Sequence, residues 1–82
     1  MEKSVFTREY RILQETLRAA RRKANLTQVE LAKKLGQSQS FVSRYERGET
    51  RLDLVQLRTV CIALGTSLAS LVQGFERRLR KR

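Results

Sequence analysis

The side chains in this sequence that could take part in chemistry are mainly cationic. Lys and Arg number 18 against 8 Asp and Glu, which gives the 82 residues a net charge of +10. Such an excess indicates a polyanionic partner, either nucleic acid or an anionic membrane surface. There is no His and only one Cys, Cys61, so a single chain cannot build a Cys/His zinc site, a disulfide or a His-dependent catalytic triad. We therefore expect no catalytic residues, no metal and no cofactor.

The apolar segments are too short for a membrane protein. No apolar run approaches the roughly 20 residues that a helix needs to cross a bilayer, and the N-terminal segment lacks the apolar stretch of a signal peptide. A membrane-surface protein would also leave the regular placement of Gly36 and Gly48 unexplained. Cys61 lies among apolar neighbours, which suits a small buried side chain in a reducing compartment. We expect a cytoplasmic protein that does not bind a membrane.

Five short helices are predicted by the apolar spacing and by the residues that begin and end helices. The first has apolar or small residues spaced by three and four, with Thr7 as a possible N-cap and Asn25 as a left-handed residue after its end. The later four are expected to begin at Thr27, Ser38, Asp53 and Ser67 and to end at Gly36, Gly48, Gly65 and Gly74. No segment has the alternation of a strand bounded by hairpin turns. The fold class is therefore predicted to be all-α.

The segment after Gly74 differs in composition from the rest of the chain, because it carries five positive charges and one negative charge. We expect a single domain at residues 1–74 followed by a basic C-terminal tail at residues 75–82. Two alternatives remain for this tail, a basic helical extension or a disordered end. Its charges would either make an accessory phosphate contact or simply be solvated.

The second and third predicted helices are separated by only Gly36, Gln37 and Ser38. Such a short link holds two helices at a steep angle, so that the second can enter the DNA major groove with its N-terminal residues facing the bases. The segment QVELAKKLGQSQSFVSRYERG, residues 28–48, resembles the helix-turn-helix of the Cro/lambda-repressor family, also called the xenobiotic-response-element type. The likeness extends from about Leu13 to Gly74. It implies a five-helix, lambda-repressor-like DNA-binding domain.

The resemblance also implies roles for individual side chains. It places base-reading side chains at Gln39, Ser40, Ser43 and Arg44, and phosphate-binding side chains at Gln28, Ser38, Arg47 and Arg51. Gln39 could bond an adenine edge and Arg44 a guanine edge, although Arg44 could instead contact only a phosphate. In the family, the residue equivalent to Gln28 also orients the first reading side chain. Lys33 and Lys34 are expected to be solvated.

Two further features of this segment concern its packing. The resemblance implies that Arg21 and Glu46 form a partly buried ion pair, which would tie the first helix to the end of the third. Phe41 lies one helical turn before Tyr45. It could stack on Tyr45, which we prefer, or it could cover a thymine methyl group in the groove.

The function implied by the resemblance is sequence-specific binding of double-stranded DNA by a transcriptional regulator, a repressor of a phage, plasmid or bacterial operon. The helix at about 38–47 would read the major groove. Half-sites about 34 Å apart would call for a homodimer. The last helix is the candidate dimer surface, with Leu68, Leu71, Val72 and Phe75. Leu68 and Leu71 are expected in the core instead, and Phe75 is the residue expected to be left over. The alternative is an antitoxin-type or adaptor protein that binds a protein partner and autoregulates through the same motif.

Overall fold

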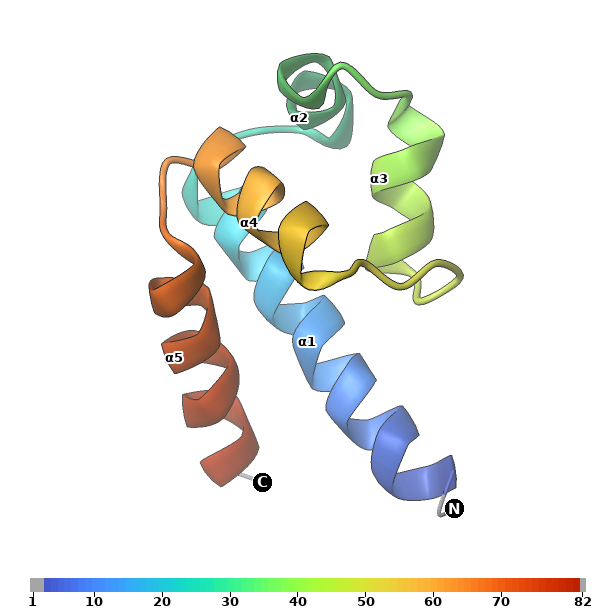
Figure 1. The fold of residues 1–82 in the computed structure, drawn as a ribbon, viewed down its shortest axis with the longest axis vertical. Coiled ribbons are helices and arrows are strands. Elements are labelled where there is room, and N and C mark those ends of the chain that lie inside the picture. Colours follow the sequence, from blue (N-terminus) through green and yellow to red (C-terminus); the bar gives the residue numbers. More distant parts are fainter. Residues whose placement is uncertain (1–2, 82) are drawn as a thin grey trace.

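The computed structural model describes residues 3–81, and the side chains from residue 7 to residue 81. Its helices are α1 (Lys3–Lys23), α2 (Gln28–Leu35), α3 (Gln39–Glu46), α4 (Leu54–Ala63) and α5 (Leu68–Arg80) (Figure 1). No strand occurs within the described residues. The predicted all-α class with five helices is confirmed.

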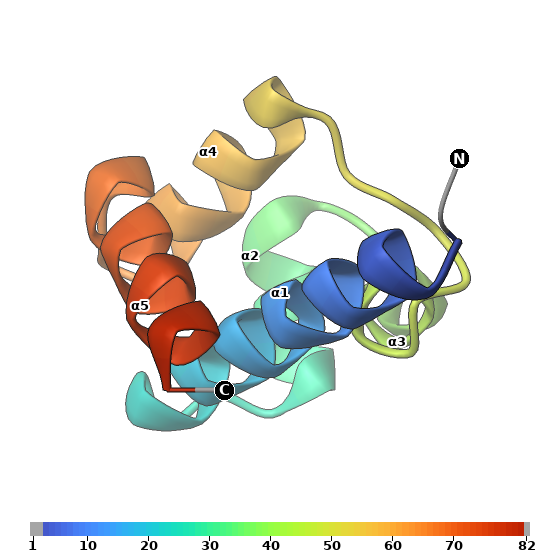
Figure 2. The same cartoon turned by 90° about the horizontal axis from the view of Figure 1, so that it is seen from below.

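The long helix α1 organises the other four. It packs against both α3 and α5, while α2 packs against α3 and α4, and α4 packs against α5. Figure 2 shows that α3 and α5 lie on opposite sides of α1, as they do in Figure 1. The start of α1 and the end of α5 lie at the end of the molecule opposite α2 (Figure 1). One side of α3 is therefore held by the body of the fold and the other side is left free.

Local capping fixes where three of the helices begin. Thr27 and Glu30 form a reciprocal capping box, in which Glu30 N donates to Thr27 Oγ1 at 3.1 Å and Thr27 N donates to Glu30 Oε1 at 2.8 Å. Asp53 forms a second box with Gln56 at the start of α4. Ser67 accepts from Ser70 N at the start of α5. These predicted N-caps are confirmed, and each satisfies a backbone N–H that has no partner within its helix.

Two predicted helix ends are wrong. Thr7 is not an N-cap, because α1 already begins at Lys3. Gly74 does not end α5, which continues to Arg80. Glycine costs a helix only about 1 kcal/mol, and Gly74 is buried against α1, where Thr16 Cγ2 lies 3.6 Å from the position of a Cβ. Packing on α1 therefore outweighs the weak helix propensity of Gly74. Residues 75–80 of the predicted tail continue α5, so the helical extension is the alternative that the structure confirms.

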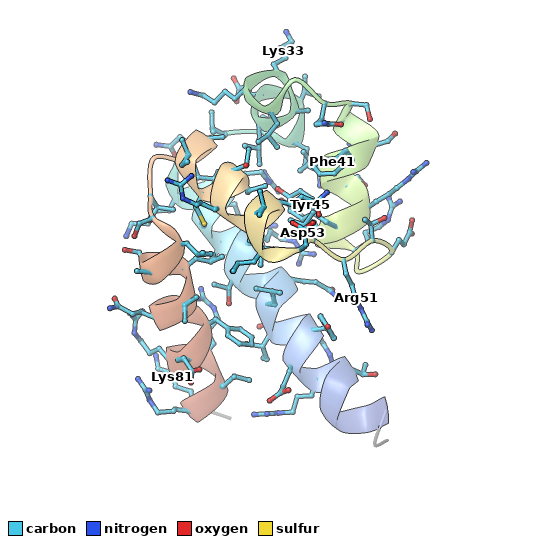
Figure 3. The ribbon with its side chains drawn as sticks, viewed as in Figure 1. Lys33, Phe41, Tyr45, Arg51, Asp53 and Lys81 are labelled. Atoms are coloured by element: carbon cyan, nitrogen blue, oxygen red, sulfur yellow. The ribbon has the colours of Figure 1, made fainter. Side chains whose placement is uncertain are left out.

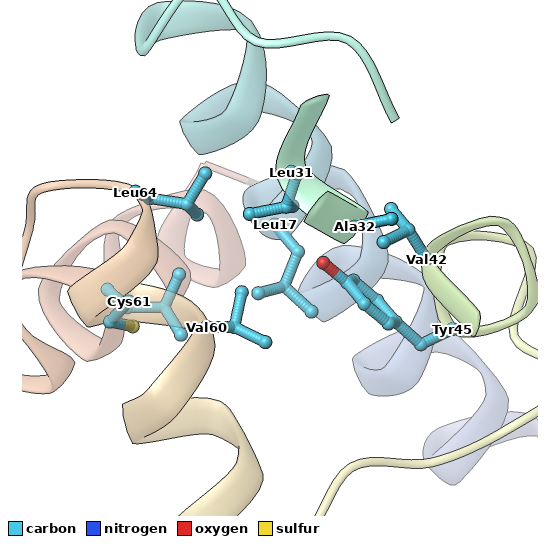
Figure 4. Packing of buried hydrophobic residues seen from close by; sticks show 9 residues of the cluster. Leu17, Leu31, Ala32, Val42, Tyr45, Val60, Cys61 and Leu64 are labelled. Atoms are coloured by element: carbon cyan, nitrogen blue, oxygen red, sulfur yellow. The ribbon is translucent and has the colours of Figure 1, made fainter. Parts of the chain in front are cut away.

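The core lies where the five helices converge, and Figure 4 shows its members from α1 to α4 by label. Its buried cluster consists of Leu17, Leu31, Ala32, Val42, Tyr45, Val60, Cys61, Leu64 and Leu71. Cys61 is a buried free thiol as expected, and burial raises its pKa. Ile12 and Thr16 are also buried, a result that the apolar spacing did not predict. Thr16 is accommodated because its hydroxyl donates to Ile12 O at 2.7 Å.

No single helix among residues 3–81 is long and apolar enough to cross a membrane. The pair α4 and α5 reaches the required length and composition only when taken together, and it is bent by 103° at its break.

Candidate nucleic-acid interface

The turn between α2 and α3 projects the start of α3 from the body of the protein. Gly36 has the left-handed φ of 67° that such a turn requires, and Gln37 N donates to Ala32 O at 2.9 Å to close the end of α2. Ser38 then caps α3, with its Oγ accepting from Phe41 N at 3.3 Å. Val42, which is fully buried, anchors α3 to the core. The first turn of α3 is thereby left facing solvent.

The four side chains expected to read bases lie on one arc of α3. Gln39, Ser40 and Arg44 are exposed, and Ser43 is half-buried. The opposite arc of the helix carries the buried residues Val42, Tyr45 and Glu46. The structure therefore brings together two hydroxyls, one carboxamide and one guanidinium on a single outward surface. These are donors and acceptors of the kinds that can bond base edges in a major groove.

Gln39 is held by Gln28, which lies at the start of α2. Gln39 Nε2 donates to Gln28 Oε1 at 2.7 Å. Gln28 in turn donates from its Nε2 to Glu46 Oε1 at 3.0 Å. The resemblance implied the first of these bonds, but nothing in the sequence indicated the second. Three side chains from α2 and from both ends of α3 are thus linked in series.

Glu46 is almost completely buried, with 1% of its surface exposed, and is neutralised by arginines of α1. Arg21 Nε lies 2.7 Å from Glu46 Oε2, and Arg21 Nη2 lies 3.1 Å from Oε1, so the expected ion pair is confirmed. This hydrogen bonding to Glu46 raises the pKa of Arg21. Arg18, which the sequence reasoning missed, donates from Nη2 to the backbone O of Glu46 at 2.8 Å. The negative charge of Glu46, at the C-terminal end of α3, is therefore compensated by the arginines of α1.

Two of the candidate phosphate ligands, Arg47 and Arg51, lie just after the C-terminal end of α3. Arg47 donates to both carboxylate oxygens of Glu49, from Nε at 3.0 Å and from Nη2 at 3.1 Å. Its Nη1 donates to Ser43 Oγ at 2.7 Å. The shared hydrogen bonds raise the pKa of Arg47 and lower that of Glu49. The structure thus places Arg47, a predicted phosphate ligand, beside Ser43, a predicted base-reading residue. It also pairs Arg47 with Glu49, which the sequence did not lead us to expect.

Arg51 lies in the loop between α3 and α4 (Figure 3). Its guanidinium carbon lies 3.9 Å from the centre of the Tyr10 ring, which is a cation–π contact with α1. The contact was not foreseen, because Tyr10 and Arg51 are far apart in the sequence. It holds an exposed cation near the same end of α3 as Arg47.

Phe41 packs on Tyr45 in an edge-to-face arrangement, with ring centroids 5.6 Å apart and an interplanar angle of 74°. Both rings come from the inner side of α3 (Figure 3). Burial raises the pKa of Tyr45 well above its usual value. The stacking preferred from the sequence is confirmed, and it helps to fix α3 on the core.

An α3 that projects from a short turn and is supported by α2 defines a helix-turn-helix protein. The helix-turn-helix family matches the chain over residues 17–71, more than half of its length, and the chain belongs to that family in its Cro/lambda-repressor form. Membership supports a DNA-binding regulator of transcription.

Solved structures agree with this assignment. An XRE-family like protein from Pseudomonas syringae pv. tomato str. DC3000 is 38% identical over 93% of each chain, with a TM-score of 0.84. A crystal structure of the clp gene regulator ClgR from Corynebacterium glutamicum is 29% identical, covering 88% of this chain and 77% of ClgR, with a TM-score of 0.79. A second ClgR structure is 31% identical over 83% and 87% of the two chains, with a TM-score of 0.75. No curated protein matched the chain.

Proposed function

We propose that this protein is a cytoplasmic, sequence-specific repressor of transcription that inserts α3 into the major groove of double-stranded DNA. The observation that carries the proposal is the exposed first turn of α3, where Gln39 is held in place by Gln28. A reading side chain that is already ordered loses little entropy on binding. Repression follows if the protein occupies a promoter, since bound protein then excludes the polymerase.

Each reading residue has a chemical role in this proposal. Gln39 bonds N6 and N7 of an adenine, Arg44 bonds O6 and N7 of a guanine, and the hydroxyls of Ser40 and Ser43 contact either kind of base. Arg44 is suited to its role because it is exposed, and none of the hydrogen bonds found among residues 7–81 engages its guanidinium.

Phosphate binding would come from both ends of the motif. Gln28 and Ser38 lie at the starts of α2 and α3, where unpaired backbone N–H groups and the helix dipole favour an anion. Arg47 and Arg51 lie beyond the other end of α3, and they would contact the sugar–phosphate backbone there. This arrangement fixes the register of α3 in the groove without adding sequence information.

A homodimer would let two copies of α3 read successive half-sites about 34 Å apart. Leu71, which is 5% exposed, belongs to the core as expected, and Leu68 is partly buried and packs against the core. Phe75, the residue expected to be left over, is partly buried. Val72, at 46%, stays exposed on α5 and supports the proposed dimer surface there. Light scattering on the free protein and on a palindromic duplex tests this proposal. Two chains per duplex are expected, and a monomer in both samples would contradict it.

The test of base reading is selection of binding sites from random duplex DNA at stated salt, with the wild type and with Arg44→Ala. We expect the variant to lose about 1–3 kcal/mol of discrimination at one base pair while the rest of the selected motif is kept. A uniform loss of affinity with a shallower salt dependence would reduce Arg44 to a phosphate ligand.

A second candidate function is the antitoxin-type or adaptor protein, which is favoured by a groove between α1 and α5. The groove has a volume of about 610 Å³ and is lined in part by Lys23, Arg77 and Arg78. Its lining residues come largely from α1 and α5. Because α5 lies on the side of α1 opposite α3 (Figure 2), DNA on α3 would leave the groove free for an acidic partner. Affinity capture from the native host with the wild type and with Arg77→Glu is the discriminating experiment. A partner lost in the variant supports this function, and DNA alone supports the first.

A further inference from the structure

A chain of two hydrogen bonds runs from a buried carboxylate to an exposed reading side chain. Glu46 Oε1 accepts from Gln28 Nε2 at 3.0 Å, and Gln28 Oε1 accepts from Gln39 Nε2 at 2.7 Å. Glu46 is 1% exposed, Gln28 is half-buried and Gln39 is exposed. The family likeness implies only the contact between the two glutamines, so the role of Glu46 in this chain is additional.

The chemistry of these groups fixes the direction of both bonds. A carboxylate can only accept hydrogen bonds, so Gln28 must turn its NH₂ group toward Glu46 and its oxygen toward Gln39. That oxygen is also only an acceptor, so Gln39 must turn its NH₂ group toward Gln28. We propose that Glu46 is a positioning residue for base recognition, which sets through Gln28 the orientation of the Gln39 carboxamide. This inference rests on the proposed function.

The carboxylate is itself held in one place. Glu46 Oε1 accepts from Arg21 Nη2 at 3.1 Å as well as from Gln28, so both of its lone pairs are used. Glu46 Oε2 accepts from Arg21 Nε at 2.7 Å. Arg21 also donates from Nη1 to Leu26 O at 2.9 Å, which fixes the guanidinium to the loop between α1 and α2. The orientation of Gln39 is therefore anchored on the core of the protein rather than chosen in the groove.

The consequence is a restricted set of bases for Gln39. One of its two N–H groups is already used by Gln28, which leaves one donor and the Oε1 acceptor for DNA. One donor and one acceptor match N7 and N6 of adenine. Guanine presents two acceptors, O6 and N7, so a Gln39 in this state satisfies only one of them. If Gln39 were released from Gln28, both of its N–H groups could donate to DNA, and Gln39 would bind guanine more readily.

The experiment measures one ratio, the affinity for the selected site divided by the affinity for the same site with guanine in place of the Gln39-contacted adenine. We expect at least about fivefold for the wild type, as for a bidentate pair. Glu46→Gln replaces a fixed acceptor by an amide of either orientation, and Gln28→Met removes the middle of the chain. We expect both variants to bring the ratio to about twofold or less.

The double variant Gln28→Glu with Glu46→Gln provides a rescue. A carboxylate at position 28 accepts from Gln39 and from the new amide at position 46, so the orientation of Gln39 is again fixed. We expect the ratio to return toward the wild-type value. The double variant keeps the net charge of the wild type but moves the negative charge from position 46 to position 28, a proposed phosphate contact, so it should weaken binding to all sequences alike.

Val60→Ala is the matched control for stability, because Val60 is a buried residue of α4 that is not part of this chain of bonds. We expect it to lower the thermal midpoint and leave the ratio unchanged. Two results would overturn the role of Glu46. One is a ratio that falls in Val60→Ala. The other is a ratio that stays at the wild-type value in both Gln28→Met and folded Glu46→Gln. If Glu46→Gln does not fold, Gln28→Met and the double variant decide the question. A wild type that selects no site, or a ratio unaffected by Gln39→Ala, overturns the proposed reading by Gln39 as well.

Discussion

At the start of α3, Gln39 is connected through Gln28 to Glu46, a carboxylate that is 1% exposed and paired with arginines of α1. Beyond its end, Arg47 is connected to Glu49, and both of those side chains are more than half exposed. The first arrangement ends on a carboxylate that is shielded from solvent and tied to the core. The second is screened by water and salt and can exchange partners easily. The comparison suggests that base reading is preorganised in this protein, whereas phosphate binding is adaptable.

The largest expected effect is a difference in the stability of the fold between variants of Arg21 and of Arg47. Arg21→Met leaves Glu46 buried without its bidentate partner, which should destabilise the fold by about 3–5 kcal/mol. Arg47→Met removes only an exposed pair and should leave the unfolding midpoint almost unchanged. Urea unfolding of both variants measures the difference. Adding Glu46→Leu to Arg21→Met should recover much of the lost stability. Equal unfolding midpoints for Arg21→Met and Arg47→Met would contradict the distinction between the two arrangements.

Sequence reasoning succeeded where the cause of a structure is local. The capping box of Thr27 and Glu30 and the caps at Asp53 and Ser67 depend on residues three positions apart, so their spacing is sufficient to predict them. The Arg21–Glu46 pair was foreseen only because the family likeness supplies it. Gly74 misled the prediction of α5, because a weak local preference was judged without the packing against Thr16.

The contacts that were missed involve long side chains with several possible partners. Gln28 could have faced solvent or a phosphate, and only the fold places Glu46 within 3.0 Å of its Nε2. Arg47 had Glu49 as a near neighbour in sequence, and this spacing is the signal that could have identified the pair. The stacking of Arg51 on Tyr10 had no local signal, because it joins α1 to the loop after α3.

A smaller effect is expected on DNA binding from the exposed arrangement. Arg47→Met should weaken affinity for all sequences alike and reduce the slope of log affinity against log salt by about 1. Fluorescence anisotropy at several salt concentrations provides the measurement. A loss confined to one base position would instead assign Arg47, or the Ser43 hydroxyl that it contacts, to base reading.

The smallest expected effect is an increase in affinity for DNA. Glu49→Gln removes a negative charge from the proposed phosphate-binding loop and frees Arg47 from its partner, so affinity for DNA should rise about two- to fivefold at low salt. The gain should shrink as salt is added. Glu9→Gln, at an exposed residue in the first half of α1, is a matched control for net charge. An equal gain in this control would show that general charge alone is responsible.

The most direct test of the central claim is the ratio of affinities for a selected site and for a random duplex of the same length, at about 0.15 M salt. Sequence-specific reading by α3 predicts a ratio of about 1,000 or more, which Gln39→Ala lowers without changing affinity for the random duplex. A ratio within a few-fold of unity would contradict the account, because binding would then depend on the positive charge of the chain alone.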